Sequence, residues 1–372
     1  MKMQTLATAI VLSLSTMGVY AAPTLTGALD LSIDYLPQNN SVGTDRDVTR
    51  VNSNSSWIGV KGEEKLNDRT SVLYTAEWGI SIDSKTSDQT FTNRNIYAGI
   101  KDKKLGTLRV GNQDSPLKSL SSVVDSFNNR IENRLDINGI MTGESRVANS
   151  LYYQTPDFTV GQGKLKVALL TATGEASGVD RVSGAVKVAG RGLGDALSGS
   201  VTYTHDKFVL GVAYDKAIPT TFANKGVLNA ASREVSTPTA FAAANTVRLV
   251  ARVNATNDLA IKGLYQTSEV EAKNGNSSSA QNIDDAQGWL LGVEYNIPQH
   301  KALTVKGQYS HNITSYKTAG MADFEAQQYA VGVDYAVNKQ VKAYTQAAYL
   351  TLEQGSAKDT QTAVGVGVEY KF

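Results

Sequence analysis

The sequence contains no cysteine, only three histidines, and almost equal numbers of positive and negative side chains. The absence of cysteine excludes a disulfide scaffold, a cysteine zinc site and a thiol nucleophile. The 36 Lys and Arg against 35 Asp and Glu leave no basic excess for nucleic acid, because phosphate binding needs a positively charged face. Long hydrophobic runs are missing from the body of the chain. The longest, 240–244, is far shorter than the roughly 20 residues that a membrane-spanning helix needs.

The first 21 residues have the pattern of an export signal. Lys2 precedes an apolar stretch over 6–17, and the triplet 19–21 places small side chains three residues and one residue before a cleavage point. The alternative is a buried first helix, but charge, apolar stretch and cleavage site follow one another in the order that export requires. We therefore expect a signal peptide over 1–21 and a single domain over 22–372.

The body of the chain alternates between apolar and polar residues with a period of two. In the last segment, 364–372, the residues Val364, Val366, Val368 and Tyr370 share one face, whereas Glu369 and Lys371 lie on the other. Such alternation predicts strands with one apolar and one wet face. It occurs in 16 segments: 25–35, 56–61, 72–82, 94–101, 107–111, 146–155, 164–172, 197–204, 208–215, 247–253, 259–266, 289–295, 303–309, 327–335, 341–350 and 364–372.

The lengths of the connections and the positions of tyrosine distinguish a membrane barrel from a soluble β-sandwich. Short connections, such as 205–207, alternate with long ones, such as 112–145, 216–246 and 351–361. Tyrosine repeatedly ends the apolar face, where an amphipathic ring suits a lipid–water boundary. We predict an all-β fold, a transmembrane antiparallel β-barrel of about 16 strands. Its ionic side chains, Lys306 and Glu369 among them, should point to the interior, because a charge in hydrocarbon costs up to about 2–4 kcal/mol.

Several segments resemble the Gram-negative trimeric porin family, particularly its neisserial and β-proteobacterial members. These segments are 24–30, 57–66, 93–101, 105–116 and 146–156, together with the terminal Phe372. The resemblance covers nearly the whole chain after residue 21. Two positions depart from the family pattern, because Trp57 and Asn112 stand where the family usually has basic residues.

The resemblance implies a homotrimer in outer-membrane lipid whose third external loop, 112–145, folds inward and narrows a water-filled pore. It also implies that Tyr370 and Phe372 form the terminal signal read during outer-membrane assembly. In related porins the second external loop, here near 83–93, reaches into a neighbouring subunit.

The charges expected near this constriction fall into two groups of opposite sign. An acidic loop facing a basic wall would create a field across the pore, and several convergent charges in a narrow throat give a severalfold ion preference. The acidic group is Asp114, Asp125, Glu132, Asp136 and Glu144, accompanied in the loop by Lys118, Arg130 and Arg134. The basic wall is Arg109, Arg146, Lys164, Lys166, Arg248, Arg252, Lys262, Lys306 and Lys342.

The function expected from these features is passive diffusion of ions and small hydrophilic solutes, with a weak preference for anions. Two alternatives remain open: a substrate-selective channel on the same barrel, and a surface adhesin or receptor that uses the long loops. No catalytic residue, metal site or cofactor is expected. No pair among His205, His300 and His311 has metal-ligand spacing, and a catalytic barrel would need a base and a nucleophile together at one depth.

Overall fold

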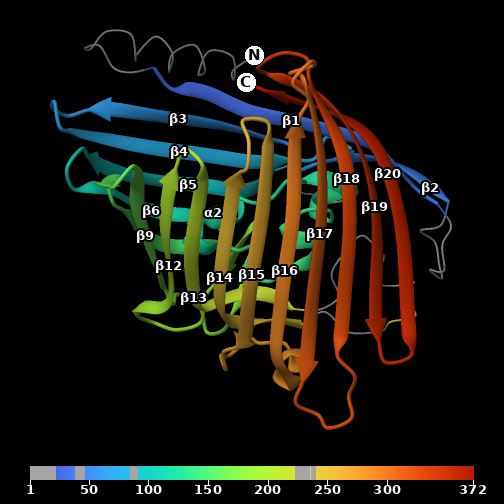
Figure 1. The fold of residues 1–372 in the computed structure, drawn as a ribbon. Coiled ribbons are helices and arrows are strands. Elements are labelled where there is room, and N and C mark those ends of the chain that lie inside the picture. The colour runs from blue at the N-terminus through green and yellow to red at the C-terminus, as the bar shows by residue number, and fades with distance from the viewer. Residues whose placement is uncertain (1–21, 38–46, 84–90, 223–234, 236–239) are drawn as a thin grey trace, which may run out of the picture.

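The computed structural model describes residues 22–37, 47–83, 91–222, 235 and 240–372. The signal peptide expected over 1–21 lies outside these residues, as does the centre of the second external loop, 84–90. Most of the described chain is β-strand, and the helices are short (Figure 1).

Sixteen strand positions form the wall of a barrel. β2 and β3 together occupy one position, β7 and β8 occupy another, and the small strands β10 and β11 lie within the connection between β9 and β12. The strands are β1 (Thr24–Leu36), β2 (Val48–Ser53), β3 (Trp57–Lys65), β4 (Thr70–Ile80), β5 (Phe91–Asp102), β6 (Gly106–Asp114), β7 (Arg146–Gln154), β8 (Phe158–Val160), β9 (Gly163–Thr173), β10 (Asp180–Val182), β11 (Ala185–Lys187), β12 (Leu193–His205), β13 (Phe208–Phe222), β14 (Ala240–Asn254), β15 (Leu259–Val270), β16 (Ile283–Asn296), β17 (Leu303–Tyr316), β18 (Phe324–Ala336), β19 (Val341–Gln354) and β20 (Ala357–Lys371).

The first and last strands close the ring. β1 pairs antiparallel with β3 on one side and with β20 on the other, so that no edge of the wall is left unpaired. At the junction the backbones of Gly27 and Phe372 exchange hydrogen bonds of 2.9 and 3.1 Å. Closure is required because an unpaired backbone group in hydrocarbon costs several kcal/mol. The predicted barrel of about 16 antiparallel strands is therefore confirmed.

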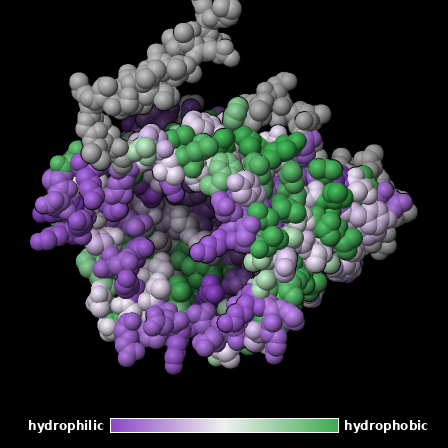
Figure 2. All heavy atoms as spheres, turned by 90° about the horizontal axis from the view of Figure 1, so that it is seen from above, coloured by the Kyte–Doolittle hydropathy of each residue, from purple (hydrophilic) through white to green (hydrophobic). Residues whose placement is uncertain are grey.

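The two faces of the wall differ in chemistry as the alternation predicts. Val331 and Leu291 expose 59% and 58% of their surface on the outside, whereas Lys306 and Glu369 expose only 6% and 8%. Glu369 pairs with Lys342 and Lys306 pairs with Asp334, both across neighbouring strands of the inner face. Seen from one end, the barrel has a central hollow that is bordered largely by hydrophilic side chains (Figure 2). Hydrophobic side chains lie on the flank of the barrel.

The expected pattern of connections holds at one end of the barrel and fails in part at the other. The short turns lie where the sequence predicts them, for example between β12 and β13 at residues 206–207. The connection predicted over 351–361 is wrong: β19 and β20 extend through it as a hairpin, and only Gly355 and Ser356 form the turn. Gly355 takes a φ of +62°, which glycine adopts without strain.

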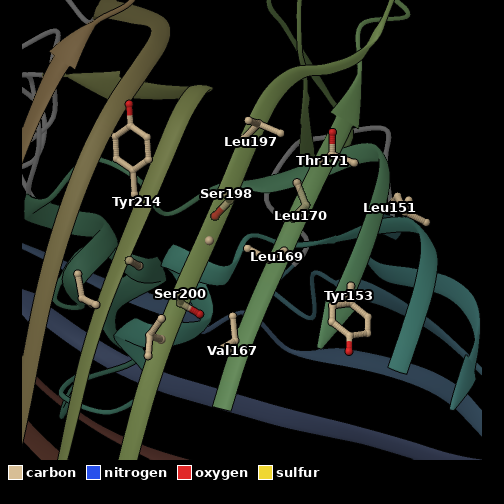
Figure 3. A pocket seen from close by; sticks show the side chains of 14 residues that line it. Leu151, Tyr153, Val167, Leu169, Leu170, Thr171, Leu197, Ser198, Ser200 and Tyr214 are labelled. Carbon is tan, nitrogen blue, oxygen red and sulfur yellow. The ribbon is translucent and has the colours of Figure 1, made fainter. Parts of the chain in front are cut away.

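The outer wall also carries a groove that is separate from the interior. It has a volume of about 660 Å³ and lies over β7, β9, β12 and β13 (Figure 3). Gly199 pairs with Leu169 on one side and Tyr214 on the other, so the missing side chain leaves this space between them. Its lining is almost entirely apolar, as expected of a surface that faces acyl chains. None of the helices in the described part of the chain has the length and apolar character to cross a membrane.

Candidate functional site

The connection between β6 and β7 is an ordered segment with three short helices, α2 (Pro116–Ser121), α3 (Arg130–Asn133) and α4 (Ile137–Ile140). Ser115 caps α2 by accepting a hydrogen bond of 3.1 Å from the Lys118 N–H, and Pro116 fits the first helical position. Asp136 caps α4 in the same way, through a 3.1 Å bond from the Gly139 N–H. These caps satisfy backbone donors that such short helices cannot pair internally. We call residues 115–145 the inner segment.

Apolar side chains of the inner segment pack against the inner face of the barrel wall. Leu117, Leu120 and Phe127 are buried. Glycines in the wall make room for two of them: a methyl group added at Gly211 would collide with Leu120, and one added at Gly332 would lie 3.0 Å from the Phe127 ring. Strand glycines often mark such close approaches.

Three of the wall cations expected to face water are instead buried in contact with the inner segment. Arg248 is fully buried, forms an ion pair with Glu144 and donates a 2.8 Å hydrogen bond to the Thr142 carbonyl. Lys306 donates to the Ser126 carbonyl at 2.7 Å, and Lys262 lies 3.2 Å from the Ser126 hydroxyl. Their charges are compensated at short range, so they act as attachment points for the segment rather than as free pore charges.

Opposite charges at the base of the inner segment also pair. The Asp114 carboxylate lies 3.0 Å from the Arg146 guanidinium and 3.6 Å from the Lys118 ammonium. Asp114 was expected among the acidic residues and Arg146 in the basic wall, and the structure brings the two into contact.

The remaining acidic residues gather on one side of the segment. Asp125 accepts a 3.1 Å bond from the Phe127 N–H, and Asp136 accepts from Asn129 and Gly139. Burial, and then the negative charge of Glu144, raise the pKa of Asp136 to about 6. Burial and the charges of Asp136 and Glu144 raise the pKa of Asp125 well above its usual value. The Glu132 side chain lies outside the described residues.

The other expected wall cations contact residues outside the inner segment. The Arg109 guanidinium lies between two rings, 4.6 Å from the centre of Tyr97 and 3.9 Å from that of Tyr152. Arg252 donates a 3.2 Å bond to the Asn254 side chain, and Lys166 pairs with the exposed Asp157 at 3.4 Å. Lys164 and Lys166 both line a cavity beneath α2.

Three cavities follow one another through the barrel. One of about 260 Å³ and one of about 350 Å³ share Lys118, Asn138, Glu144 and Arg146 in their linings. The second of these shares Ser119 and Ser122 with a third cavity of about 500 Å³. Because neighbouring cavities share lining residues, they adjoin one another along the inner segment.

The sequence interpretation missed residues whose position depends on the path of the loops. Arg94 lines the middle cavity, and its guanidinium lies 5.7 Å from the centre of the Trp57 ring. Trp57 is one of the two positions where a basic residue is usual, so Arg94 brings a positive charge to the place from which one is missing. The available sequence signal for this site was the charge of Arg94 in the predicted amphipathic strand 94–101.

The carboxyl end of the chain lies at the closure of the ring. Tyr370 is 39% exposed on the outer face, and its ring centre lies 5.5 Å from that of Phe372. The role of these two residues as an assembly signal stays a prediction.

An apolar outer wall, a closed ring of strands and a charged inner path define a transmembrane β-barrel with a polar lumen. The comparison with known families assigns it further: the model of the Gram-negative porin family matches residues 7–355, and the chain belongs to this family. It is thus an outer-membrane protein.

Relatives in sequence and structure agree with this assignment. Major outer membrane protein P.IB of Neisseria meningitidis serogroup B / serotype 15 is 24% identical over 350 residues, which are 94% of this chain and 92% of that protein. An anion-selective porin from Comamonas acidovorans superposes with a TM-score of 0.68 at 19% identity, covering 95% of this chain and 100% of that one. Salmonella typhi OmpF, in complex with daunomycin, gives a TM-score of 0.65 at 15% identity, covering 96% and 100%. At these identities the solved structures bear on the fold alone.

Proposed function

We propose that the protein is a general diffusion porin through which ions and small hydrophilic solutes pass passively, with a weak preference for anions. The observation that carries this proposal is the series of three adjoining cavities inside a barrel whose outer face is apolar. Family membership points to a channel rather than to an enzyme. The inner segment narrows the path, because its residues line all three cavities.

The proposed anion preference depends on which charges in the pore are not neutralised by a partner or by protonation. Arg109 has aromatic neighbours rather than a carboxylate, and an arginine stays charged at any physiological pH. On the acidic side, Asp136, with a pKa of about 6, loses its negative charge below neutral pH, and the raised pKa of Asp125 acts in the same direction. The balance therefore favours anions, but weakly, because Asp114 and Glu144 remain as partners of basic residues.

Export and assembly complete the proposal. Residues 1–21 act as a cleaved signal peptide, and residues 22–372 form one barrel domain that assembles as a homotrimer in outer-membrane lipid. Membership of the porin family and the structural likeness to other porins support the trimer. Crosslinking or native mass spectrometry of the purified protein tests it.

A salt gradient across a planar bilayer tests the ion preference. The reversal potential should have the sign of an anion-selective channel and a small magnitude. A clear cation preference would overturn the proposed charge balance.

The substrate-selective alternative has one observation in its favour, the Arg109 guanidinium held between Tyr97 and Tyr152. Three residues do not form a track of the kind that a selective channel needs. Saturable block of the current by a single class of solute at this site would favour the alternative.

A further inference from the structure

The connection between β9 and β12 contains a small hairpin, formed by β10 and β11, at the mouth of the pore. Val186 of this hairpin pairs with Val147 of β7, and the Gly184 carbonyl accepts a 3.1 Å hydrogen bond from Arg146. Gly184 has a φ of +72°, and a methyl group added there would collide with the Asn93 carbonyl. The tip therefore lies tightly between β5 and β7 and requires glycine.

The rest of this connection is attached at the other side of the mouth. The Val179 N–H donates a 2.7 Å hydrogen bond to the Asn274 carbonyl, in the connection after β15. Arg181 donates a hydrogen bond to the Thr221 hydroxyl of β13, and its guanidinium lies 4.3 Å from the centre of the Phe241 ring of β14. The hairpin is thus held from two sides over the entrance.

The outermost cavity, of about 260 Å³, lies between this hairpin and the inner segment. Its charged lining residues are Lys118, Arg146, Arg181 and Glu144. The first two share Asp114 as a partner, and Glu144 pairs with Arg248. Arg181 has a hydroxyl and an aromatic ring as neighbours, and no described carboxylate forms an ion pair with it.

We infer that this cavity is an outer binding subsite for small carboxylates with a compact apolar body, and that Arg181 determines its preference for anions. The inference rests on the proposed pore function and adds a ligand class to it. A guanidinium has five N–H donors, so Arg181 keeps several after its bond to Thr221. Stacking on Phe241 fixes the plane of the guanidinium, so the free donors are already oriented for a carboxylate.

The other lining residues account for the apolar body of the ligand. Val182, Ala185, Val186 and Phe241 contribute apolar surface next to the cation, which is the smaller part of a mostly polar lining. A water occupies about 30 Å³ in the liquid, so the cavity volume corresponds to a solute of modest size rather than to a bare halide ion. A benzoate-sized anion fits both the volume and the chemistry.

Block of the single-channel current by benzoate tests the inference. In the wild-type protein, benzoate added from the side of the hairpin should reduce the KCl conductance with saturation, and neutral benzamide should not. Arg181→Gln should weaken the benzoate block about fivefold or more, because it removes a charge-assisted hydrogen bond at a partly exposed site. Arg181→Lys, which keeps the charge, should retain part of the block.

Arg191→Gln is the matched control, because Arg191 is an exposed arginine of the same connection outside the cavity lining. Its benzoate block should equal that of the wild type. An unchanged block in Arg181→Gln, an equal loss in both variants, or equal block by benzamide would each overturn the subsite. Wild-type channels that conduct with anion preference but are not blocked by benzoate would also overturn the subsite. Absence of conductance in the wild type would instead contradict the proposed pore.

Discussion

The Arg130 guanidinium lies 3.3 Å from the Asp30 carboxylate and connects α3 of the inner segment with the first strand, 100 residues earlier in the chain. Both side chains are almost completely buried, and the Tyr344 hydroxyl donates a 2.5 Å hydrogen bond to the same carboxylate. Asp30 thus accepts from two distant parts of the chain, which also contact each other, because the Arg130 guanidinium lies 3.1 Å from the centre of the Tyr344 ring. This pair attaches the middle of the inner segment to β1.

Replacing Arg130 should loosen the inner segment. Arg130→Ala leaves the buried Asp30 carboxylate without its counter-charge, which costs about 3–5 kcal/mol in comparable buried pairs. We expect a lower melting temperature and a larger, noisier single-channel conductance. Arg134→Ala, at a partly exposed residue of the same segment with no ion pair among the described residues, is the control and should change little. Wild-type conductance and melting in Arg130→Ala would show that the pair does not hold the segment.

The anion preference should increase as the pH falls from about 8 to about 5. Asp136 has a pKa of about 6, so it loses its negative charge within this range, whereas an ordinary aspartate would stay charged. Asp125, with its pKa also raised, changes in the same direction. Asp136→Asn should flatten the pH dependence of the reversal potential. Asp323→Asn, an exposed residue of another connection, should leave it intact.

The same pKa shifts determine how pH affects stability. A carboxyl group whose folded pKa is raised binds its proton more tightly in the folded state. Its contribution therefore favours folding at low pH and is lost as the pH rises from about 4 through about 6. Thermal unfolding should show a stronger dependence of this sign in the wild type than in Asp136→Asn, which retains the contribution of Asp125. A wild-type inner segment that becomes more stable across this rise in pH would contradict the burial of Asp136.

The orientation of the wall can be tested by one charge placed on either face. Val331 lies on the outer face of β18, so Val331→Arg should lower the free energy of unfolding in lipid vesicles by about 2–4 kcal/mol. Thr202 lines the inner cavity beneath α2, and Thr202→Arg should cost less than about 1 kcal/mol. Equal costs for the two variants would contradict the assigned faces.

The close approach between Gly211 and Leu120 predicts a compensating pair of mutations. Gly211→Val should displace α2 and lower stability by about 1–3 kcal/mol, because the added side chain collides with Leu120. Leu120→Ala in the same protein should restore part of the loss. Strictly additive effects in a double-mutant cycle would mean that the two positions are not in contact.

The strands within the membrane could be predicted because physics leaves little choice there. At Val364, Val366 and Val368 the alternation and the cost of a charge in lipid fix both the strand and its phase. Beyond the membrane this constraint ends. β13 therefore continues to Phe222 and β14 begins at Ala240, so both strands extend into a region predicted as a loop. A bulge between Asp215 and Ile218 breaks the alternation there.

The charges of the pore were only partly predictable, for a different reason. The period of two indicates that Arg248, Lys262 and Lys306 point inward, and they do. Whether they face water or the inner segment depends on the path of residues 115–145, which no strand periodicity encodes. The hairpin β10–β11 and the position of Arg181 likewise depend on contacts between residues distant in sequence, such as those with Thr221 and Phe241.

Swelling of liposomes that contain the purified protein, in a series of neutral sugars of increasing size, measures diffusion through the barrel. A water-filled path should give rates that fall steadily with sugar size and rise in proportion to concentration. Swelling no faster than in protein-free liposomes, or a rate that saturates for one sugar alone, would contradict a general diffusion pore.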